Sequence, residues 1–501
     1  MPDTSHTTTK RPPVVAIMGH IDHGKSTLLS YIRKSALALN EAGGITQHIS
    51  AYEVEHPTAD GVAKITFIDT PGHAAFSGHR NRGASIADVC ILVVSAEDGV
   101  KPQTVEALNS IKKSNTPYIV AITKTDKPDA NIERTKQSLA EHDIFVEGYG
   151  GDIPMVAVSG KTGAGIPELL DMILLVADLE NLMGDRGALA SGMIIENNLD
   201  IRKGISATCI ITNGSLVKGN FVISEQAITP VRMVENWKGQ PIQDATFSMP
   251  IKLIGWDSLP TVGSTFKTFE TKKEAEEYIK QMESGKSKVE SREDTQKNTD
   301  VKDFPLVIKA DTGGSLEALT QEIMKSEMER IRPHIVFSGI GAVSENDIRM
   351  AKGKDNAIVI GFHVKVDPQA KTLAERDGVT IQHFDVIYTM SEWLKETLLA
   401  QTPKREVEEQ TGEAKVLKMF SKVKDKQVIG CRMETGSMHV GDIVKIMRRD
   451  SEIGSGKVRE LQSQKLKISS VEEGKEFGTL VEAKIEIAPG DKLQVFTLTQ
   501  K

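Results

Sequence analysis

The stretch Gly19-His20-Ile21-Asp22-His23-Gly24-Lys25-Ser26 stands directly after the apolar run 13–18 and opens a helical pattern at Lys25. It matches G-x-x-x-x-G-K-[ST] in the strand–turn–helix context that a phosphate-binding loop requires. Its glycines let backbone N–H groups surround the α- and β-phosphates. The Lys25 ammonium group reaches the β- and γ-phosphates, and the Ser26 hydroxyl binds Mg²⁺. The sequence therefore predicts a nucleotide-binding loop whose further members are Asp22, His23, Gly24 and Thr27.

A second motif, Asp69-Thr70-Pro71-Gly72, follows the apolar run 65–68. A carboxylate at a strand end can hold Mg²⁺ through water, and Gly72 lets a backbone N–H group approach the γ-phosphate. Thr46 lies between the two motifs, and its hydroxyl is expected to complete the Mg²⁺ shell. His73 directly follows Gly72, where an imidazole can orient the attacking water. These residues predict hydrolysis of the γ-phosphate.

Two further motifs predict which base is bound. Thr123-Lys124-Thr125-Asp126 ends the apolar run 118–122. The Asp126 carboxylate can accept hydrogen bonds from N1–H and the exocyclic amine of guanine, a pair of donors that adenine lacks. The Lys124 stem can lie over the base. Ser159-Gly160-Lys161 follows the apolar run 155–158 and can contact the guanine oxygen through backbone N–H groups. Together the four motifs predict a GTP/GDP site with Mg²⁺.

The distribution of apolar runs, turns and charges divides the chain into several domains. Apolar runs separated by helical patterns predict parallel sheets covered on both faces, and short runs separated by turns predict antiparallel barrels. The fold class is multidomain α/β plus β. The expected parts are a flexible N-terminus (1–12), a P-loop GTPase domain (13–182), a β-barrel (188–282), a flexible linker (283–303), an α/β sandwich domain with a helix capped by Ser315 (304–402) and a C-terminal β-barrel (411–499).

Composition limits the classes of function. No run of 18 apolar residues and no secretory or transit pattern is present, and the three cysteines are widely spaced, which together predict a cytoplasmic protein with no membrane partner. The net charge is −7, although residues 411–501 carry 17 Lys and Arg against 13 Asp and Glu. This basic segment either contacts RNA phosphates or is an ordinary solvated surface.

The phosphate-loop stretch and Asp69-Thr70-Pro71-Gly72-His73 resemble the translational GTPase family. Residues 41–49 and 71–76 are similar to bacterial translation initiation factor two, as are residues 308–319, 338–343 and 360–362 of the third expected domain. The resemblance covers about residues 12–499, without the long N-terminal extension of many members. It implies a monomeric GTP-hydrolysing factor that binds the small and large ribosomal subunits, ribosomal RNA and formylmethionyl initiator tRNA. The family's role is to promote initiator binding and subunit joining.

The resemblance also implies roles for single residues. His73 takes the catalytic position, and Ile21 and Ile45 form an apolar gate around it. In the last barrel, Cys431 and Glu476 match members of the family's formylmethionine pocket, with Phe477 where a second cysteine is expected.

Some positions depart from the family. Thr123 replaces the usual Asn, Gly160 replaces the usual Ala, and Gln462-Ser463 stands where a basic pair is usual. Cys431 can also be read as a buried apolar residue. An alternative function is therefore another ribosome-associated translational GTPase with altered or lost formylmethionine recognition. A nucleotide-gated scaffold with little catalysis is a further alternative, and His73 discriminates it from an enzyme.

Overall fold

The computed structural model describes residues 8–33, 48–200, 202–285, 301–328, 330–354, 356–402, 406–449, 451–464 and 466–500. It divides into two compact units, residues 1–401 and residues 402–501. The predicted Mg²⁺ ligand Thr46 and gate residue Ile45 lie outside the described residues, as do residues 286–300 of the predicted linker. Among the described residues, no helix combines the length and apolar character needed to cross a bilayer.

The first domain is built on a six-stranded sheet with the order β3-β4-β2-β5-β6-β7. Its strands are β2 (Val14–Gly19), β3 (Ser50–Thr58), β4 (Gly61–Asp69), β5 (Val89–Ser95), β6 (Tyr118–Thr123) and β7 (Met155–Ala157). All neighbours run parallel except β3 and β4. Strands β2 and β5 are buried along their whole length, as expected for central strands covered on both faces.

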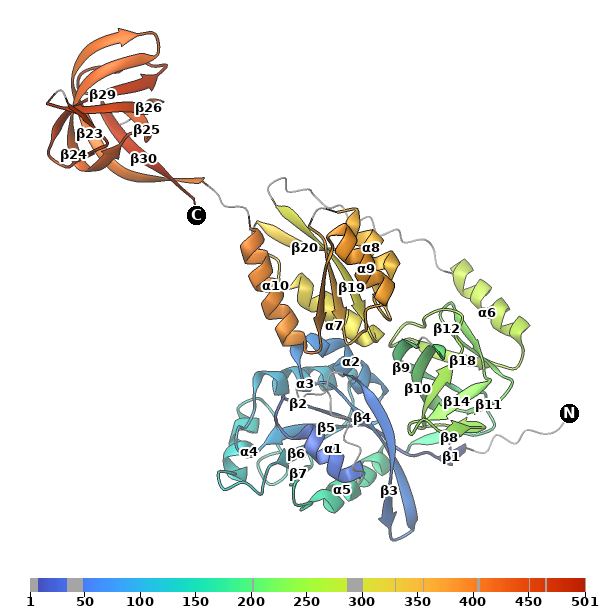
Figure 1. Ribbon diagram of the computed structural model, residues 1–501. Coiled ribbons are helices and arrows are strands. Elements are labelled where there is room, and N and C mark those ends of the chain that lie inside the picture. The colour runs from blue at the N-terminus through green and yellow to red at the C-terminus, as the bar shows by residue number, and fades with distance from the viewer. Residues whose placement is uncertain are drawn as a thin grey trace. The chain divides into compact units, whose positions relative to one another are not determined.

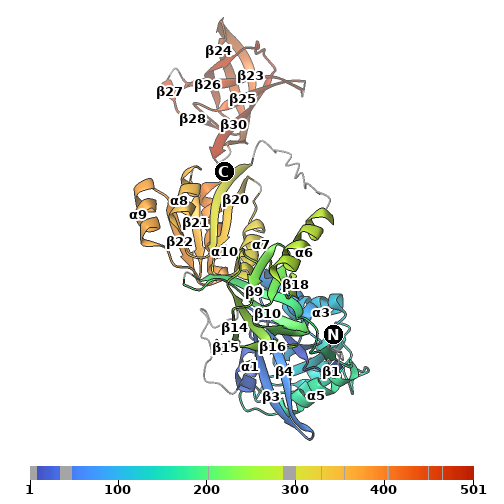
Figure 2. The same ribbon diagram turned by 90° about the vertical axis from the view of Figure 1, so that its right-hand side faces the viewer.

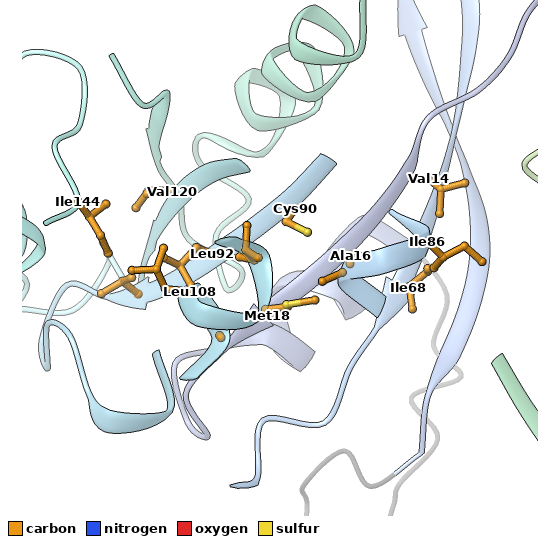
Figure 3. Packing of buried hydrophobic residues seen from close by; sticks show 14 of the residues in the cluster. Val14, Ala16, Met18, Ile68, Ile86, Cys90, Leu92, Leu108, Val120 and Ile144 are labelled. Carbon is orange, nitrogen blue, oxygen red and sulfur yellow. The ribbon is translucent and has the colours of Figure 1, made fainter. Parts of the chain in front are cut away.

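Helices cover both faces of this sheet. One core includes residues of α1 (Lys25–Arg33) and α5 (Ile166–Leu179). The other includes residues of α2 (Ser77–Ile86), α3 (Pro102–Ser114) and α4 (Ile132–Ala140). Figure 3 shows Met18, Leu92 and Leu108 of this second core. The loops after the parallel strands therefore gather at one edge of the sheet, where α/β folds bind ligands.

A short strand precedes the predicted start of the domain. Strand β1 (Thr8–Lys10) pairs antiparallel with β8 (Met183–Asp185). Arg11 then donates two hydrogen bonds to the Asp88 carboxylate, at 2.5 and 2.7 Å. The prediction of a flexible segment over residues 1–12 is therefore wrong for residues 8–12. Backbone pairing and one ion pair hold this segment in place. Neither needs apolar side chains, so the sequence shows no apolar pattern here.

The second domain is an antiparallel eight-stranded sheet with the order β13-β12-β18-β9-β10-β17-β14-β15. Its strands are β9 (Ser191–Asp200), β10 (Gly204–Asn213), β12 (Phe221–Ser224), β13 (Ala227–Pro230), β14 (Met233–Asn236), β15 (Pro241–Ile242), β17 (Pro250–Ile254) and β18 (Thr265–Phe269). Strands β11 (Ser215–Val217) and β16 (Asp244–Thr246) form a separate pair. The predicted barrel takes the form of a curled sheet around one apolar core. Helix α6 (Lys272–Gly285) follows it.

The third domain is the predicted α/β sandwich. Its parallel sheet has the order β20-β19-β21-β22. The strands are β19 (Lys302–Ala310), β20 (Ile331–Ile340), β21 (Ile358–Phe362) and β22 (Thr380–Phe384). Helices α7 (Gly313–Met324) and α10 (Ile387–Gln401) lie on one face, and α8 (Glu345–Lys352) and α9 (Pro368–Asp377) on the other, as Figures 1 and 2 show. Thr312, and not Ser315 as predicted, caps α7, because its side chain accepts the Ser315 N–H group.

The second unit is a closed barrel of six strands, with the cyclic order β23-β30-β25-β26-β29-β24. The strands are β23 (Glu406–Val423), β24 (Lys426–His439), β25 (Ile443–Arg448), β26 (Ser451–Ser463), β29 (Glu476–Ala483) and β30 (Lys492–Gln500). Two short strands, β27 (Leu466–Ile468) and β28 (Ser470–Glu472), pair with β26 and β24. The predicted C-terminal barrel is confirmed, and its interior is filled by apolar side chains.

Candidate functional site

A cleft of about 340 Å³ opens at the carboxyl edge of the first domain's sheet. Most predicted site residues line it: Ile21, Asp22, Gly24, Lys25, Ser26, Thr27, Gly72, His73, Thr123, Lys124, Asp126, Gly160 and Lys161, with Lys127 in addition. Three others, His23, Asp69 and Ser159, are buried next to these lining residues. The structure thus brings all four motifs to one place, as expected from the ends of neighbouring parallel strands.

The first loop is shaped to surround an anion. Asp22 and Gly24 have positive φ angles of 64° and 85°, which turn the loop tightly. The Lys25 ammonium group donates to the carbonyl oxygens of Gly19 at 3.0 Å and His20 at 2.7 Å. Burial lowers the pKa of Lys25 to about 8, although the nearby Asp69 carboxylate opposes this shift. A bound polyphosphate would favour the charged form further, because opposite charges raise the pKa of an amine.

Gly72 belongs to the same cluster through a close backbone approach. A β-carbon at this position would lie 2.7 Å from the Lys25 nitrogen and 3.0 Å from the Gly19 carbonyl oxygen. A larger residue would therefore displace the Lys25 ammonium group and crowd the backbone of the phosphate loop. This position places a backbone N–H group beside the lysine that is predicted to contact the γ-phosphate.

Thr123 ties the base-binding motif to the phosphate loop. Its hydroxyl donates to the carbonyl oxygen of His23 at 2.5 Å and lies 3.3 Å from that of Val94. The threonine therefore holds the loop by hydrogen bonding. His23 itself is buried, and burial lowers the pKa of its imidazole to about 4. Its neutral ring lies inside the protein and shapes the loop.

Asp126 is oriented by Ser159. The Ser159 hydroxyl donates to Asp126 Oδ1 at 2.6 Å, and this hydrogen bond lowers the pKa of the Asp126 carboxyl. The carboxylate is therefore ionised and oriented at neutral pH. Sequence reasoning predicted only a backbone contact from the Ser159 motif and missed this side-chain role. Lys124 has a positive φ of 60°, and its ammonium group lies 3.1 Å from Glu97.

His73 is held in a defined orientation. Its Nδ1 accepts the Ala75 N–H group at 2.8 Å, so the neutral ring carries its proton on Nε2. Burial lowers the pKa of His73 to about 4, which keeps the ring neutral. Arg80 in α2 donates to the His73 carbonyl oxygen at 2.5 Å.

The ring of His73 packs against the ring of Tyr388 in α10 in a T-shaped arrangement, with ring centroids 4.1 Å apart. No sequence signal points to Tyr388, because it comes from the third domain. Ile21 also lines the cleft, and its backbone N–H donates to the Gln103 side chain at 2.9 Å.

The predicted pocket residues of the last barrel lie on different sides of its wall. Cys431 on β24 stands opposite Phe477 on β29, and both side chains are buried in the barrel core. Burial raises the pKa of the Cys431 thiol to about 12. Glu476 is exposed, because successive side chains of a strand alternate between faces. Cys431 and Phe477 thus meet inside the barrel, and Glu476 lies outside it.

Three family models match successive parts of the chain. The Elongation factor Tu GTP binding domain matches residues 10–178, and Elongation factor G domain 2 matches residues 189–269. Translation-initiation factor 2 matches residues 279–395. The chain is a translational GTPase. Its first domain binds and hydrolyses GTP, and the cleft described above lies within that domain.

Two solved structures match this translational GTPase over nearly its whole length. GDP-bound aIF5B from Aeropyrum pernix is 26% identical, covers 98% of this chain and 92% of its own, and superposes with a TM-score of 0.46. A bacterial selenocysteine-specific elongation factor is 15% identical, covers 97% of this chain and 58% of its own, and has a TM-score of 0.41.

Proposed function

We propose that this translational GTPase is a bacterial-type initiation factor that promotes binding of formylmethionyl initiator tRNA to the small ribosomal subunit and joining of the large subunit. The observation that carries the proposal is the Translation-initiation factor 2 match over residues 279–395, joined to a GTP-binding domain. Elongation-type factors are expected to have barrels in this third position, whereas this chain has a parallel sheet between helices. The partners are both subunits and their RNA, and the factor acts as a monomer in the cytoplasm.

The residues of the cleft fit GTP with Mg²⁺. The Ser26 hydroxyl and the Asp69 carboxylate are oxygen donors, the ligand type that Mg²⁺ prefers, and Asp69 acts on the Lys25 charge at close range. Ser26 would hold the ion directly and Asp69 through water. When bound, the ion would supply positive charge beside the β- and γ-phosphate oxygens. Lys25 and the backbone around Gly24 and Gly72 bind the phosphates.

The resting arrangement of His73 supports slow hydrolysis in the absence of a ribosome. Its Nδ1 accepts a hydrogen bond from the Ala75 N–H group, and its ring packs against the ring of Tyr388. To accept a hydrogen bond or a proton from the attacking water, the ring must leave this arrangement. Ribosome binding would supply the free energy for that movement, so hydrolysis becomes coupled to assembly.

Ribosome-stimulated hydrolysis tests the proposal. GTP turnover is measured with the factor alone, with small subunits, with large subunits and with both. We expect slow turnover alone and the largest stimulation when the subunits join. Each subunit preparation is also assayed without the factor as a background control. Negligible stimulation by joining subunits would contradict the assignment to initiation.

The alternative is a ribosome-associated GTPase with altered or lost formylmethionine recognition. It is favoured by the burial of Cys431 and Phe477 in the barrel core, where they act as apolar packing residues.

Protection of the aminoacyl ester distinguishes the two functions. The factor is mixed with formylmethionyl initiator tRNA and, separately, with unformylated methionyl tRNA, and ester hydrolysis is followed. We expect selective protection of the formylated species. Equal or absent protection would support the alternative and leave the GTPase assignment untouched.

A further inference from the structure

Three metal-ligating side chains meet outside the nucleotide cleft. His48 precedes β3 of the GTPase domain, and Asp311 and His363 follow strands β19 and β21 of the α/β sandwich domain. His48 Nε2 lies 2.7 Å from Asp311 Oδ2, and His363 Nδ1 lies 3.6 Å from the same oxygen. The three donor atoms lie within 4.8 Å of one another. All three residues are partly exposed, so the cluster lies close to the protein surface.

Two residues of the cluster, Asp311 and His363, lie at the carboxyl ends of neighbouring strands in the sandwich domain. The strand order β20-β19-β21-β22 reverses its direction of growth between β19 and β21. Ala310 and Phe362 are register partners at the carboxyl ends of these two strands, and Asp311 and His363 are the next residues. In open α/β sheets the crevice beyond such a reversal is where ligands bind.

The hydrogen bond at His363 Nε2 orients the ring so that Nδ1 can act as a metal ligand. Its Nε2 lies 2.7 Å from the backbone carbonyl oxygen of Asp385, which must accept the Nε2 proton. The lone pair of the neutral ring is therefore on Nδ1. Among the described residues this buried Nδ1 has no hydrogen-bond partner, although it faces the Asp311 carboxylate. Histidine ligands in metal sites are oriented in this way, with the second nitrogen bound to a carbonyl or carboxylate oxygen.

We propose that His48, Asp311 and His363 bind a divalent transition-metal ion of the Zn²⁺ class. Two imidazoles and one carboxylate suit Zn²⁺, Co²⁺ or Ni²⁺, whereas Mg²⁺ and Ca²⁺ prefer oxygen ligands alone. Ligands about 2.0 Å from a tetrahedral ion lie about 3.3 Å apart. The separations of 2.7 and 3.6 Å from the Asp311 oxygen lie on either side of this value. The two histidine nitrogens lie within 4.8 Å of each other and would move to the same separation when an ion binds. The fourth position would hold water.

The ion would connect two domains. His48 belongs to the GTPase domain, and the other two ligands belong to the α/β sandwich domain, so bound metal stabilises their contact. The Arg82–Glu317 ion pair, at 2.6 Å, joins the same two domains without metal. Metal is therefore expected to add to an existing contact and is not needed for the domains to fold.

The test uses the untagged full-length chain without nucleotide and with Mg²⁺ in excess. Binding of Zn²⁺ is measured by equilibrium dialysis, and binding of Co²⁺ by its visible absorption. The variants are His363→Gln and Asp311→Asn. The matched control is His334→Gln, which changes an exposed histidine of the same domain in the same way. A circular dichroism spectrum and an unfolding temperature that match the wild-type chain in the absence of added transition metal show that each variant is folded.

We expect one equivalent of metal to bind the wild-type chain and the control. Either cluster variant should weaken that binding by at least about 10–100-fold, the loss that even outer-shell changes cause. The same ion should raise the unfolding temperature of the wild-type chain and not that of the variants. Absence of stoichiometric binding by the wild-type chain, or equal binding by the variants, would overturn the proposal. Neither outcome bears on GTP hydrolysis or ribosome binding, because neither nucleotide nor ribosomes are present.

Discussion

His73→Ala is expected to lower ribosome-stimulated GTP hydrolysis by about 10²–10⁴-fold, the usual contribution of a positioned acid or base. GTP and GDP binding should change little, since the imidazole contacts protein groups, among them the Ala75 backbone and the Tyr388 and Phe76 rings. The neutral ring is suited to orienting water because burial lowers its pKa to about 4. Single-turnover hydrolysis on assembled ribosomes, with nucleotide affinity measured separately, gives both quantities.

The matched control for this variant is His142→Ala. His142 is an exposed histidine of the same domain, and its ring lies 2.9 Å from the Ser138 carbonyl oxygen, away from the cleft. The His142→Ala variant should hydrolyse GTP at the wild-type rate. If His73→Ala does so too, the catalytic assignment is wrong, and a nucleotide-gated scaffold or another catalytic group must be considered.

Asp126→Asn is expected to weaken GTP binding by about 10⁴-fold, because a site built to hydrogen-bond a ligand discriminates strongly when donors and acceptors no longer match. The amide should instead favour xanthosine triphosphate, whose carbonyl accepts where the guanine amine donates. Ser159 strengthens this expectation. Its hydroxyl, which donates to Oδ1 at 2.6 Å, would hold the amide oxygen and direct the amide nitrogen toward the base.

Competition of GTP and xanthosine triphosphate for labelled GDP measures the change in preference. Asp129→Asn serves as the control, since it makes the same substitution at an exposed position three residues further along the loop. An unchanged nucleotide preference in Asp126→Asn would refute the role given to this carboxylate.

Motifs at strand ends made the nucleotide site predictable. Lys25, His73, Asp126 and Gly160 are far apart in the sequence, yet each follows or adjoins a predicted parallel strand. Because such strands end at the same edge of a sheet, their loops had to converge, and the structure places these residues around one cleft. The order of parallel strands and helices likewise made the sandwich domain predictable.

The contacts between domains could not be predicted in this way from the sequence. Tyr388 against His73, and His48 beside Asp311, depend on how two separately folded surfaces meet, which periodicity and motif spacing do not encode. The last barrel shows a second limit. Whether Cys431 faces the core depends on strand register, and irregularities in the pairing of β23 with β24 shift that register at three points.

The pairing of β1 with β8 has a consequence for the order of events during protein synthesis. Thr8 faces Asp185, 177 positions later, so strand β1 leaves the ribosome long before its partner exists. Chains fold from the N-terminus as they emerge, and contacts between distant segments form late. Strand β1 is thus among the last parts of its domain to reach its final position. Its pairing closes the GTPase domain only after every nucleotide-binding loop has been made.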